Sequence, residues 1–174
     1  MKEDERQTRS YLMRLFERHG FNPRSDLGQN FLIDLNIIEY VVEQGHIKPT
    51  DIVLEVGTGT GGMTTFMAQK ARHVISVEYD RNMHTLASEA TQKYDNITLL
   101  NCDALKNKNR LNPVVLEEID QQLKANPGSH LKLVANLPYN VGTELLVRWL
   151  TPAVWPPFWQ SLTLMFHREV AERI

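Results

Sequence analysis

The sequence predicts an α/β fold in which a mostly parallel sheet is covered by helices on both faces. Short hydrophobic runs alternate with segments of helical periodicity, an order typical of parallel strands joined by right-handed crossovers. One run, 52–56, leads directly into a glycine-rich turn, and another, 131–135, stops at the segment Asn136-Leu137-Pro138-Tyr139. Because open α/β sheets bind ligands at the carboxyl ends of their strands, both ends are candidate functional sites.

The composition is that of a soluble globular domain. The chain has 174 residues, of which 42% are hydrophobic and 23% charged, enough to bury a sizeable core. No apolar run reaches the roughly 18 residues of a membrane span, and the N-terminus is charged rather than apolar. Cys102 is the one cysteine, which excludes an internal disulfide framework and favours a reducing compartment. We therefore expect a cytoplasmic protein with no membrane segment.

The charge balance does not indicate a nucleic-acid binder. The formal net charge is −2, whereas domains that bind nucleic acids are more often basic. Any contact with RNA would therefore need a local basic patch or a further domain.

The N-terminal third is predicted to be helical before the first strand. Apolar residues at helical spacing predict a helix over 9–19, ended by Gly20. Loop-forming residues fill 22–30. Asp34 is suited to cap a second helix, which ends near Gly45.

The remainder alternates between strands and helices. We expect strands at 52–56, 73–78, 97–102, 131–135 and 161–166. We expect helices at 63–71, 81–94, 114–124, 142–150 and 168–174. The last helix stops with the chain and has no cap, so we expect the sheet to be truncated.

The glycine-rich turn is the first candidate site. Gly57, Gly59, Gly61 and Gly62 follow a strand and precede a helix, so that a ligand can approach backbone N–H groups closely. Three of these glycines also satisfy the G-x-G-x-x-G spacing of a nicotinamide site. A tight turn without a ligand is the alternative.

Three acids lie near the expected strand ends. Glu78 could accept hydrogen bonds from both ribose hydroxyls of a nucleoside, and Asp103 from an adenine amino group; the alternatives are a solvated acid and a turn cap. Glu55 precedes the glycine turn and favours a ligand with an amino-acid tail, because a pyrophosphate would be repelled by it. The acids and the turn together predict a nucleoside pocket.

The second candidate site has the parts needed to hold an adenine by its amine. The Asn136 oxygen and a carbonyl near Leu137 could accept the two N–H bonds and aim the nitrogen lone pair at a methyl donor. Pro138 would restrain the backbone, and Tyr139 could stack on a base that has left its own stack. Positioning and electrostatic fit would then supply most of the catalysis.

These motifs together resemble the rRNA adenine dimethyltransferases, which are related to the erythromycin-resistance methylases and the mitochondrial transcription-factor B proteins. The segments that carry the resemblance are Leu27-Gly28-Gln29-Asn30-Phe31-Leu32, Leu54 to Gly61, Glu78 with Asp80, Asp103-Ala104-Leu105, Asn136 to Asn140, and Arg168 to Arg173. The resemblance covers about residues 20–174. Its most specific parts are Gly-Gln-Asn-Phe-Leu and Asn-Leu-Pro-Tyr-Asn.

The resemblance implies a Rossmann-like class I methyltransferase fold and S-adenosylmethionine as the cofactor. The residues implied to bind the cofactor are Gln29, Asn30, Leu32, Glu55, Gly57, Gly59, Glu78, Asp103 and Asn136. It implies dimethylation of adjacent adenines in small-subunit rRNA, within a pre-ribosomal particle, during ribosome biogenesis. We expect a monomer that needs no metal.

The chain departs from the family pattern in three places. Thr58 stands where proline or alanine is common, a change we expect to be mild. Residues 106–130 are longer than usual and carry Lys106, Lys108 and Arg110, either an RNA-facing patch or a solvated loop. The family's last strands and C-terminal helical RNA-binding domain are expected to be absent. We therefore expect 21–174 to be an incomplete catalytic domain, preceded by an N-terminal helical extension at 1–20.

Three other functions stay open at this point. A nicotinamide-dependent oxidoreductase fits the glycine spacing and Glu78 but leaves Asn-Leu-Pro-Tyr unexplained. A non-enzymatic nucleic-acid factor of the transcription-factor B type would keep the fold and the cofactor site. A DNA adenine methylase is the third, although a proline more often replaces Leu137 in such enzymes.

Overall fold

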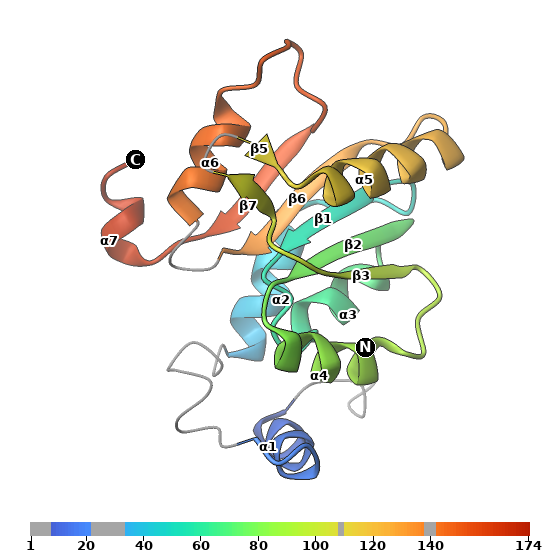
Figure 1. Ribbon diagram of the computed structural model, residues 1–174, viewed down its shortest axis with the longest axis vertical. Helices are drawn as coiled ribbons and strands as arrows, with labels where there is room; N and C mark the ends of the chain where they lie inside the picture. Colours follow the sequence, from blue (N-terminus) through green and yellow to red (C-terminus); the bar gives the residue numbers. More distant parts are fainter. Residues whose placement is uncertain (1–7, 22–33, 108–109, 138–141) are drawn as a thin grey trace.

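The computed structural model describes residues 8–21, 34–107, 110–137 and 142–174. The helices are α1 Arg9–Arg18, α2 Leu35–Gln44, α3 Gly62–Ala68, α4 Arg81–Thr91, α5 Pro113–Ala125, α6 Gly142–Leu150 and α7 Arg168–Ala171. The strands are β1 Ile52–Val56, β2 His73–Glu78, β3 Ile97–Asn101, β4 Leu105–Asn107, β5 Arg110–Leu111, β6 Leu131–Asn136 and β7 Ser161–Met165. Figure 1 shows their arrangement.

The main sheet is parallel, as the sequence predicts. Its strands run β3-β2-β1-β6-β7, and every neighbouring pair is parallel. The chain moves outward from β1 to β3, crosses back to β6, and continues to β7 at the opposite edge. All five predicted strands are confirmed, and the chain reverses its direction of travel between β1 and β6.

Helices cover both faces of this sheet because strand side chains alternate between the faces. On one face, Leu54 and Leu133 belong to a buried cluster with residues of α5 and α6, among them Trp149. On the other face, Val53 and Val134 belong to a cluster with residues of α2 and α3. The two helix pairs lie on opposite sides of the sheet in Figure 1.

Side-chain caps start four of the helices, where backbone N–H groups lack partners within the helix. Thr8 caps α1 through Tyr11 N, Asp34 caps α2, Asp80 caps α4 and Asn112 caps α5. The predicted cap at Asp34 is confirmed: its Oδ1 accepts a hydrogen bond of 2.8 Å from Asn36 N.

Helix α1 packs on α4 rather than on the sheet (Figure 1). Leu15 and Phe16 are buried there with Met83 and Leu86. At the rim of this contact, Glu89 accepts a hydrogen bond from Arg18 and lies 2.6 Å from His19 Nε2. The predicted helix is confirmed, and its apolar face has a specific partner.

The segment between β3 and β6 contains the predicted helix and, before it, two short strands that the sequence did not predict. It contains a short antiparallel hairpin, β4–β5, followed by the crossover helix α5. Leu105 and Leu111 of the hairpin are buried in the cluster beneath α5 and α6, while Lys106 and Arg110 are exposed. Each strand is too short for an alternating pattern to be visible in the sequence.

Three helices, α3, α4 and α7, end three residues earlier than the sequence predicts. Helix α3 ends at Ala68 because Asn96 Nδ2 donates to the carbonyls of Ala68 (2.8 Å) and Ala71 (3.3 Å) and so stabilises the turn that follows. The final helix, α7, has a single turn, Arg168–Ala171.

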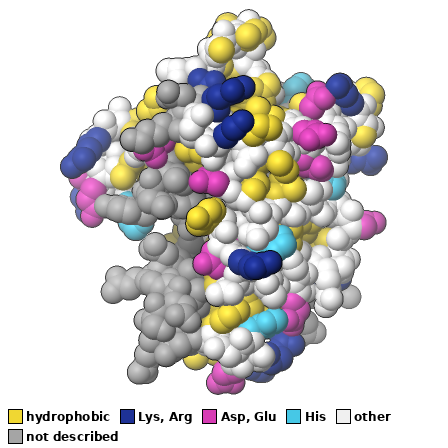
Figure 2. Space-filling model, viewed as in Figure 1, with side chains coloured by type: hydrophobic (Ala, Val, Ile, Leu, Met, Phe, Trp, Pro, Cys, Tyr) yellow, Lys and Arg dark blue, Asp and Glu magenta, His cyan; other side chains and the backbone are white. Residues whose placement is uncertain are grey.

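The surface offers no broad basic face in the view of Figure 2. Lys and Arg side chains are interspersed there with Asp and Glu. Within the described ranges, none of the helices has the length and apolar character needed to cross a bilayer.

Candidate active site at the carboxyl ends of the strands

The candidate site lies where the strand order reverses. The pairing of β1 with β6 ends at Leu54 and Leu133, whereas its pairing with β2 continues to Val56. The two central strands therefore separate before they reach Gly57 and Asn136. In open α/β sheets this reversal point, at the carboxyl ends of the strands, is the usual ligand site.

The glycine turn after β1 requires its glycines. Gly57, Gly59 and Gly61 have φ of 89°, 57° and 83°, a left-handed region that costs an L side chain about 1–2 kcal/mol. Gly57 N donates to Val77 O at 2.8 Å, which attaches the turn to β2, and Gly61 N donates to Thr58 O at 3.0 Å. The turn is thus held against the neighbouring strand.

Glu78 lies directly beside this turn. Its Oε2 accepts a hydrogen bond of 2.8 Å from Gly59 N, and its Oε1 accepts one of 2.8 Å from Asp80 N. Burial raises the pKa of the Glu78 carboxyl, against the opposing effect of these two bonds. Each oxygen has a second lone pair, so the carboxylate could still accept from the two hydroxyls of a ribose.

Asp103 follows β3 at the same edge. Its Oδ1 accepts a hydrogen bond of 2.9 Å from Leu105 N, and its carbonyl accepts one of 2.8 Å from Asn112. The turn-capping role that the sequence left open is therefore present. The side chain is exposed, and its role toward an adenine stays a prediction.

Asn136 is the last residue of β6 and pairs with Met165 of β7. Its side chain is half-buried, and Leu137 behind it is buried, with Leu137 N donating to Met165 O at 3.3 Å. A Cβ at Gly142 would lie 3.3 Å from the Leu137 Cβ, so the start of α6 packs closely against this strand end. The amide is thus presented on a well-supported backbone.

Glu55 lies beneath the turn instead of lining an open surface. It is 1% exposed, and its Oε2 accepts hydrogen bonds from Thr64 of α3 (2.5 Å) and Ser76 of β2 (2.6 Å). Burial raises the pKa of the Glu55 carboxyl to about 8, although both hydroxyls lower it and Glu78 raises it slightly. Direct contact with a ligand stays a prediction for Glu55, and the observed contacts support a role in holding the turn.

Several predicted site residues lie outside the residues that the structure describes. They are Gln29, Asn30, Leu32, Pro138 and Tyr139. The described part therefore brings together the glycine turn, Glu78, Asp103 and Asn136 at one edge of the sheet.

Comparison with known proteins decides the family. The family model for "Ribosomal RNA adenine dimethylase" matches residues 20–174. The chain belongs to this family. The part that the dimethylase model matches includes every predicted site residue and begins after α1.

Two curated relatives of the chain carry the same name. "Ribosomal RNA small subunit methyltransferase A" of Paracoccus denitrificans is 46% identical over 166 residues, which cover 94% of this chain and 54% of the relative. The protein of the same name from a Jannaschia species is 49% identical over 159 residues, covering 90% and 50%. The chain thus spans about half the length of the curated relatives it matches.

Solved structures agree with the family's fold. The 23S rRNA methyltransferase ErmE superposes with a TM-score of 0.63 at 26% identity, over 82% of this chain and 50% of that one. A dimethyladenosine transferase from Plasmodium falciparum gives 0.60 at 26% identity, over 80% and 44%. The predicted Rossmann-like methyltransferase fold, a mostly parallel sheet with helices on both faces, is confirmed.

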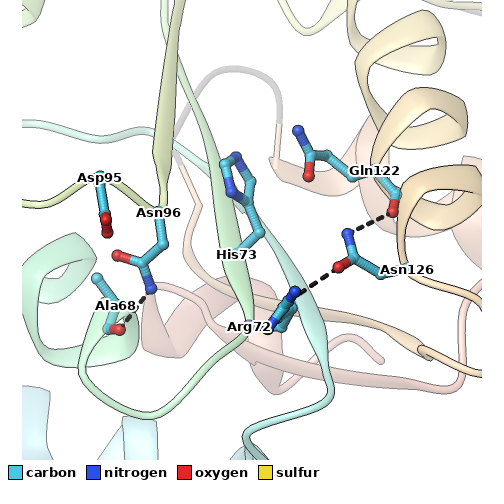
Figure 3. A pocket seen from close by; sticks show the side chains of 7 residues that line it. All are labelled: Ala68, Arg72, His73, Asp95, Asn96, Gln122 and Asn126. Carbon is cyan, nitrogen blue, oxygen red and sulfur yellow. Dashed lines mark hydrogen bonds between the residues drawn. The ribbon is translucent and has the colours of Figure 1, made fainter.

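An open polar cavity of about 600 Å³ lies near the amino ends of β2 and β3 (Figure 3). Its polar groups are occupied mainly with one another: Arg72 Nε donates to Asn126 Oδ1 at 2.8 Å, and Asn126 Nδ2 donates to Gln122 O at 2.8 Å. His73 Nε2 lies 2.8 Å from Thr98 Oγ1, and burial lowers the pKa of this imidazole. These contacts are structural, and the cavity is remote from the glycine turn.

Sequence reasoning missed the contacts of three buried hydroxyls at the site. Thr58, Thr64 and Ser76 are buried around Glu55. The Thr58 hydroxyl lies 2.6 Å from Ser76 Oγ, a contact that a proline or alanine at this position would lack. The sequence does show an acid within the hydrophobic strand 52–56. A buried acid requires polar partners, so this residue could have pointed to the hydroxyls.

Proposed function

We propose that the chain is the cofactor-binding and catalytic part of an enzyme that dimethylates the N6 amines of adjacent adenines in small-subunit rRNA, with S-adenosylmethionine as methyl donor. Family membership over residues 20–174 is the observation that carries the proposal. The glycine turn, Glu78 and Asn136 all lie at the carboxyl ends of neighbouring strands, which supports the proposal. The names of the relatives are consistent with this substrate class.

The described residues fit such a cofactor. The three left-handed glycines leave room for close approach to the turn after β1. The carboxylate of Glu78 is oriented by Gly59 N and Asp80 N, as the acceptor of a ribose diol needs to be. Asp103 would meet the adenine ring, with Gln29, Asn30 and Leu32 contributing from the N-terminal side. When bound, the cofactor supplies a methyl group on a sulfonium.

Asn136 would act on the target adenine. Its side-chain oxygen and a carbonyl near Leu137 would accept the two N–H bonds of the amine, so that the nitrogen lone pair points along the line of transfer. Pro138 would restrain that carbonyl, and Tyr139 would stack on the base. The nitrogen would lose its proton to water after the transfer, so the residues need to position the amine more than to deprotonate it.

The setting would be a pre-ribosomal particle in the cytoplasm, with the chain acting as a monomer. Exposed Lys106 and Arg110 on the β4–β5 hairpin are candidates for contact with the RNA backbone, because phosphate contacts dominate the affinity of proteins for RNA. The interspersed charges of the face in Figure 2 suggest that this patch alone would bind weakly. We therefore expect the chain to methylate intact particles more slowly than a relative of full length.

Methyl transfer is the direct test. The purified chain is incubated with labelled S-adenosylmethionine and undermethylated small-subunit rRNA, and the modified bases are mapped. We expect N6,N6-dimethyladenine at adjacent positions. Asn136→Ala should lower the transfer rate at least about a hundredfold, the scale seen when a positioned polar group is removed from an active site, with cofactor affinity less affected.

Asn126→Ala is the matched control for that substitution, because Asn126 caps α5 at the far edge of the sheet. It should leave the transfer rate within about twofold. Full activity of Asn136→Ala would refute the role of its amide.

Ligand-induced stabilisation separates the proposal from a nicotinamide enzyme. S-adenosylmethionine at 100 times its Kd should add about 2.7 kcal/mol to the free energy of unfolding and raise the melting temperature. A nicotinamide dinucleotide at the same concentration should leave the melting temperature unchanged. Stabilisation by the dinucleotide alone would overturn the proposed function.

A further inference from the structure

Four buried polar side chains form one connected group below the glycine turn. Glu55 is on β1, Thr58 is in the turn, Thr64 is on α3 and Ser76 is on β2, and each is at most 5% exposed. The three oxygen–oxygen distances that connect them are 2.5 Å (Thr64–Glu55), 2.6 Å (Ser76–Glu55) and 2.6 Å (Thr58–Ser76). The group therefore joins the turn to both adjoining strands and the following helix.

The direction of each hydrogen bond in this group can be deduced. The Ser76 hydroxyl has one proton, which it donates to Glu55 Oε2. In its contact with Thr58, Ser76 must then accept, so Thr58 is the donor. Thr64 also donates to Glu55 Oε2, which occupies both lone pairs of that oxygen, so the proton of a protonated Glu55 is carried by Oε1. The result is a directed chain from Thr58 through Ser76 to Glu55, in which each donor polarises the next.

These hydrogen bonds attach the side chain of Thr58, the turn residue between Gly57 and Gly59, to the strands beside it. The backbone attachment is weaker at this residue, because Thr58 N donates to Val77 O at 3.3 Å, compared with 2.8 Å for Gly57 N. On the other side of Thr58, Gly59 N donates to Glu78 Oε2. The orientation of Thr58 therefore affects both the turn and the carboxylate predicted to bind ribose.

We propose that Thr58 and Ser76 are positioning residues for the cofactor, whose hydroxyls fix the glycine turn in its binding conformation by anchoring it to buried Glu55. Neither side chain touches the cofactor. This inference rests on the proposed function, because it assigns the turn to the amino-acid end of S-adenosylmethionine.

The test measures binding by three ligands to four variants. The ligands are S-adenosylmethionine, S-adenosylhomocysteine and adenosine, and the last lacks the amino-acid tail. The variants are Thr58→Val, Thr58→Ser, Ser76→Ala and Thr91→Val. Thr58→Val keeps the shape of the side chain and removes its hydroxyl, Thr58→Ser restores the hydroxyl, and Ser76→Ala removes the middle of the chain.

Thr91→Val is the matched control. Thr91 is a buried threonine whose hydroxyl donates to Ala87 O within its own helix at 2.7 Å, and its Cγ2 is the atom nearest to a Cβ placed on Gly61. The control therefore has the same chemistry and a position beside the turn, but it lies outside the hydrogen-bonded chain.

We expect Thr58→Val and Ser76→Ala to raise the Kd of both tailed ligands about five- to tenfold, the loss of about one net hydrogen bond. The Kd of adenosine should change less than twofold, and Thr58→Ser and Thr91→Val should stay within about twofold of the unsubstituted chain. In methyl transfer, the KM for the cofactor should rise while the KM for RNA is unchanged.

Two results would overturn this inference alone: equal affinities for Thr58→Val, Ser76→Ala and Thr91→Val, or equal losses for adenosine and the tailed ligands. Failure of the unsubstituted chain to bind S-adenosylmethionine would instead overturn the proposed function. If Thr58→Val does not fold, Ser76→Ala carries the same comparison.

Discussion

At the scale of single residues, Glu55 is an acid that lies beneath the glycine turn and is 1% exposed. In the sequence this acid stands just before the glycine turn, where it favours a ligand with an amino-acid tail over a pyrophosphate. In the structure its carboxyl group accepts from Thr64 and Ser76 beneath the turn. Side chains alternate along β1, so Glu55 lies on the same face as Val53, toward α3. The packing of α3 on this face is what encloses the Glu55 carboxyl group.

The buried acid predicts a dependence of stability on pH. Burial raises the pKa of Glu55 from its ordinary value of 4.5 to about 8, so the folded chain keeps a proton that the unfolded chain loses. The stabilisation from Glu55 is therefore complete below pH 4.5 and is lost as the pH rises through about 8. Glu55→Gln mimics the protonated form and should become more stable than the unsubstituted chain by a few kcal/mol between pH 5 and pH 9.

Urea unfolding at several pH values measures this difference. Glu117→Gln, on the exposed side of α5, is the control for the loss of one acid. A difference between Glu55→Gln and the unsubstituted chain that is the same at pH 5 and pH 9 would contradict the buried, protonated state.

At the scale of elements, the sequence predicts helix starts and strand positions better than close approaches. Polar caps such as Asp34 are local signals, because their partners lie two or three residues away. The approach of α3 to α4 is not local: a Cβ on Gly61 would lie 3.2 Å from Thr91 Cγ2. The glycine pattern predicts a turn, but it does not tell which glycine is needed for conformation alone and which also for contact.

Two glycine substitutions separate conformation from contact. Gly61 and Gly128 have nearly the same φ, 83° and 84°, but a Cβ on Gly128 meets nothing within 4 Å. Gly128→Ala should cost about 1–2 kcal/mol of unfolding free energy from backbone strain alone. Gly61→Ala should cost at least about 1 kcal/mol more, because α4 must also shift. If chemical denaturation gives the same loss of unfolding free energy for both substitutions, α4 can shift away from α3 without a measurable cost.

At the scale of the whole molecule, the parallel topology could be predicted because it follows from the order of elements and the handedness of crossovers. The β4–β5 hairpin could not, because the two strands are stabilised by burial of Leu105 and Leu111 rather than by a pattern of their own. The site at the carboxyl ends of the strands could be predicted from where the strands end. The contacts of the hydroxyls with Glu55 could not, because they form only when β1, β2 and α3 pack together. Sequence reasoning also missed a long-range ion pair.

That pair joins the start of β1 to β6. Lys132 Nζ lies 2.9 Å from Asp51 Oδ2, with the side chains 7% and 1% exposed, and Lys132 also donates to His46 O at 2.6 Å. Asp51 Oδ2 further accepts from Lys48 N at 2.7 Å. Lys132 therefore fastens the α2–β1 connection to β6, and its hydrogen bond to His46 O spans 86 residues in sequence.

Lys132→Met should destabilise the fold strongly, because it leaves the Asp51 carboxylate buried without its cation. The expected loss in unfolding free energy is about 3–5 kcal/mol. Lys124→Met is the control, since the Lys124–Asp120 pair is 76% and 60% exposed and should contribute less than about 1 kcal/mol. Adding Asp51→Asn to Lys132→Met removes the stranded charge and should recover part of the loss. If urea unfolding shows a similarly small loss of unfolding free energy for Lys132→Met and Lys124→Met, the buried pair contributes no more to stability than the exposed one.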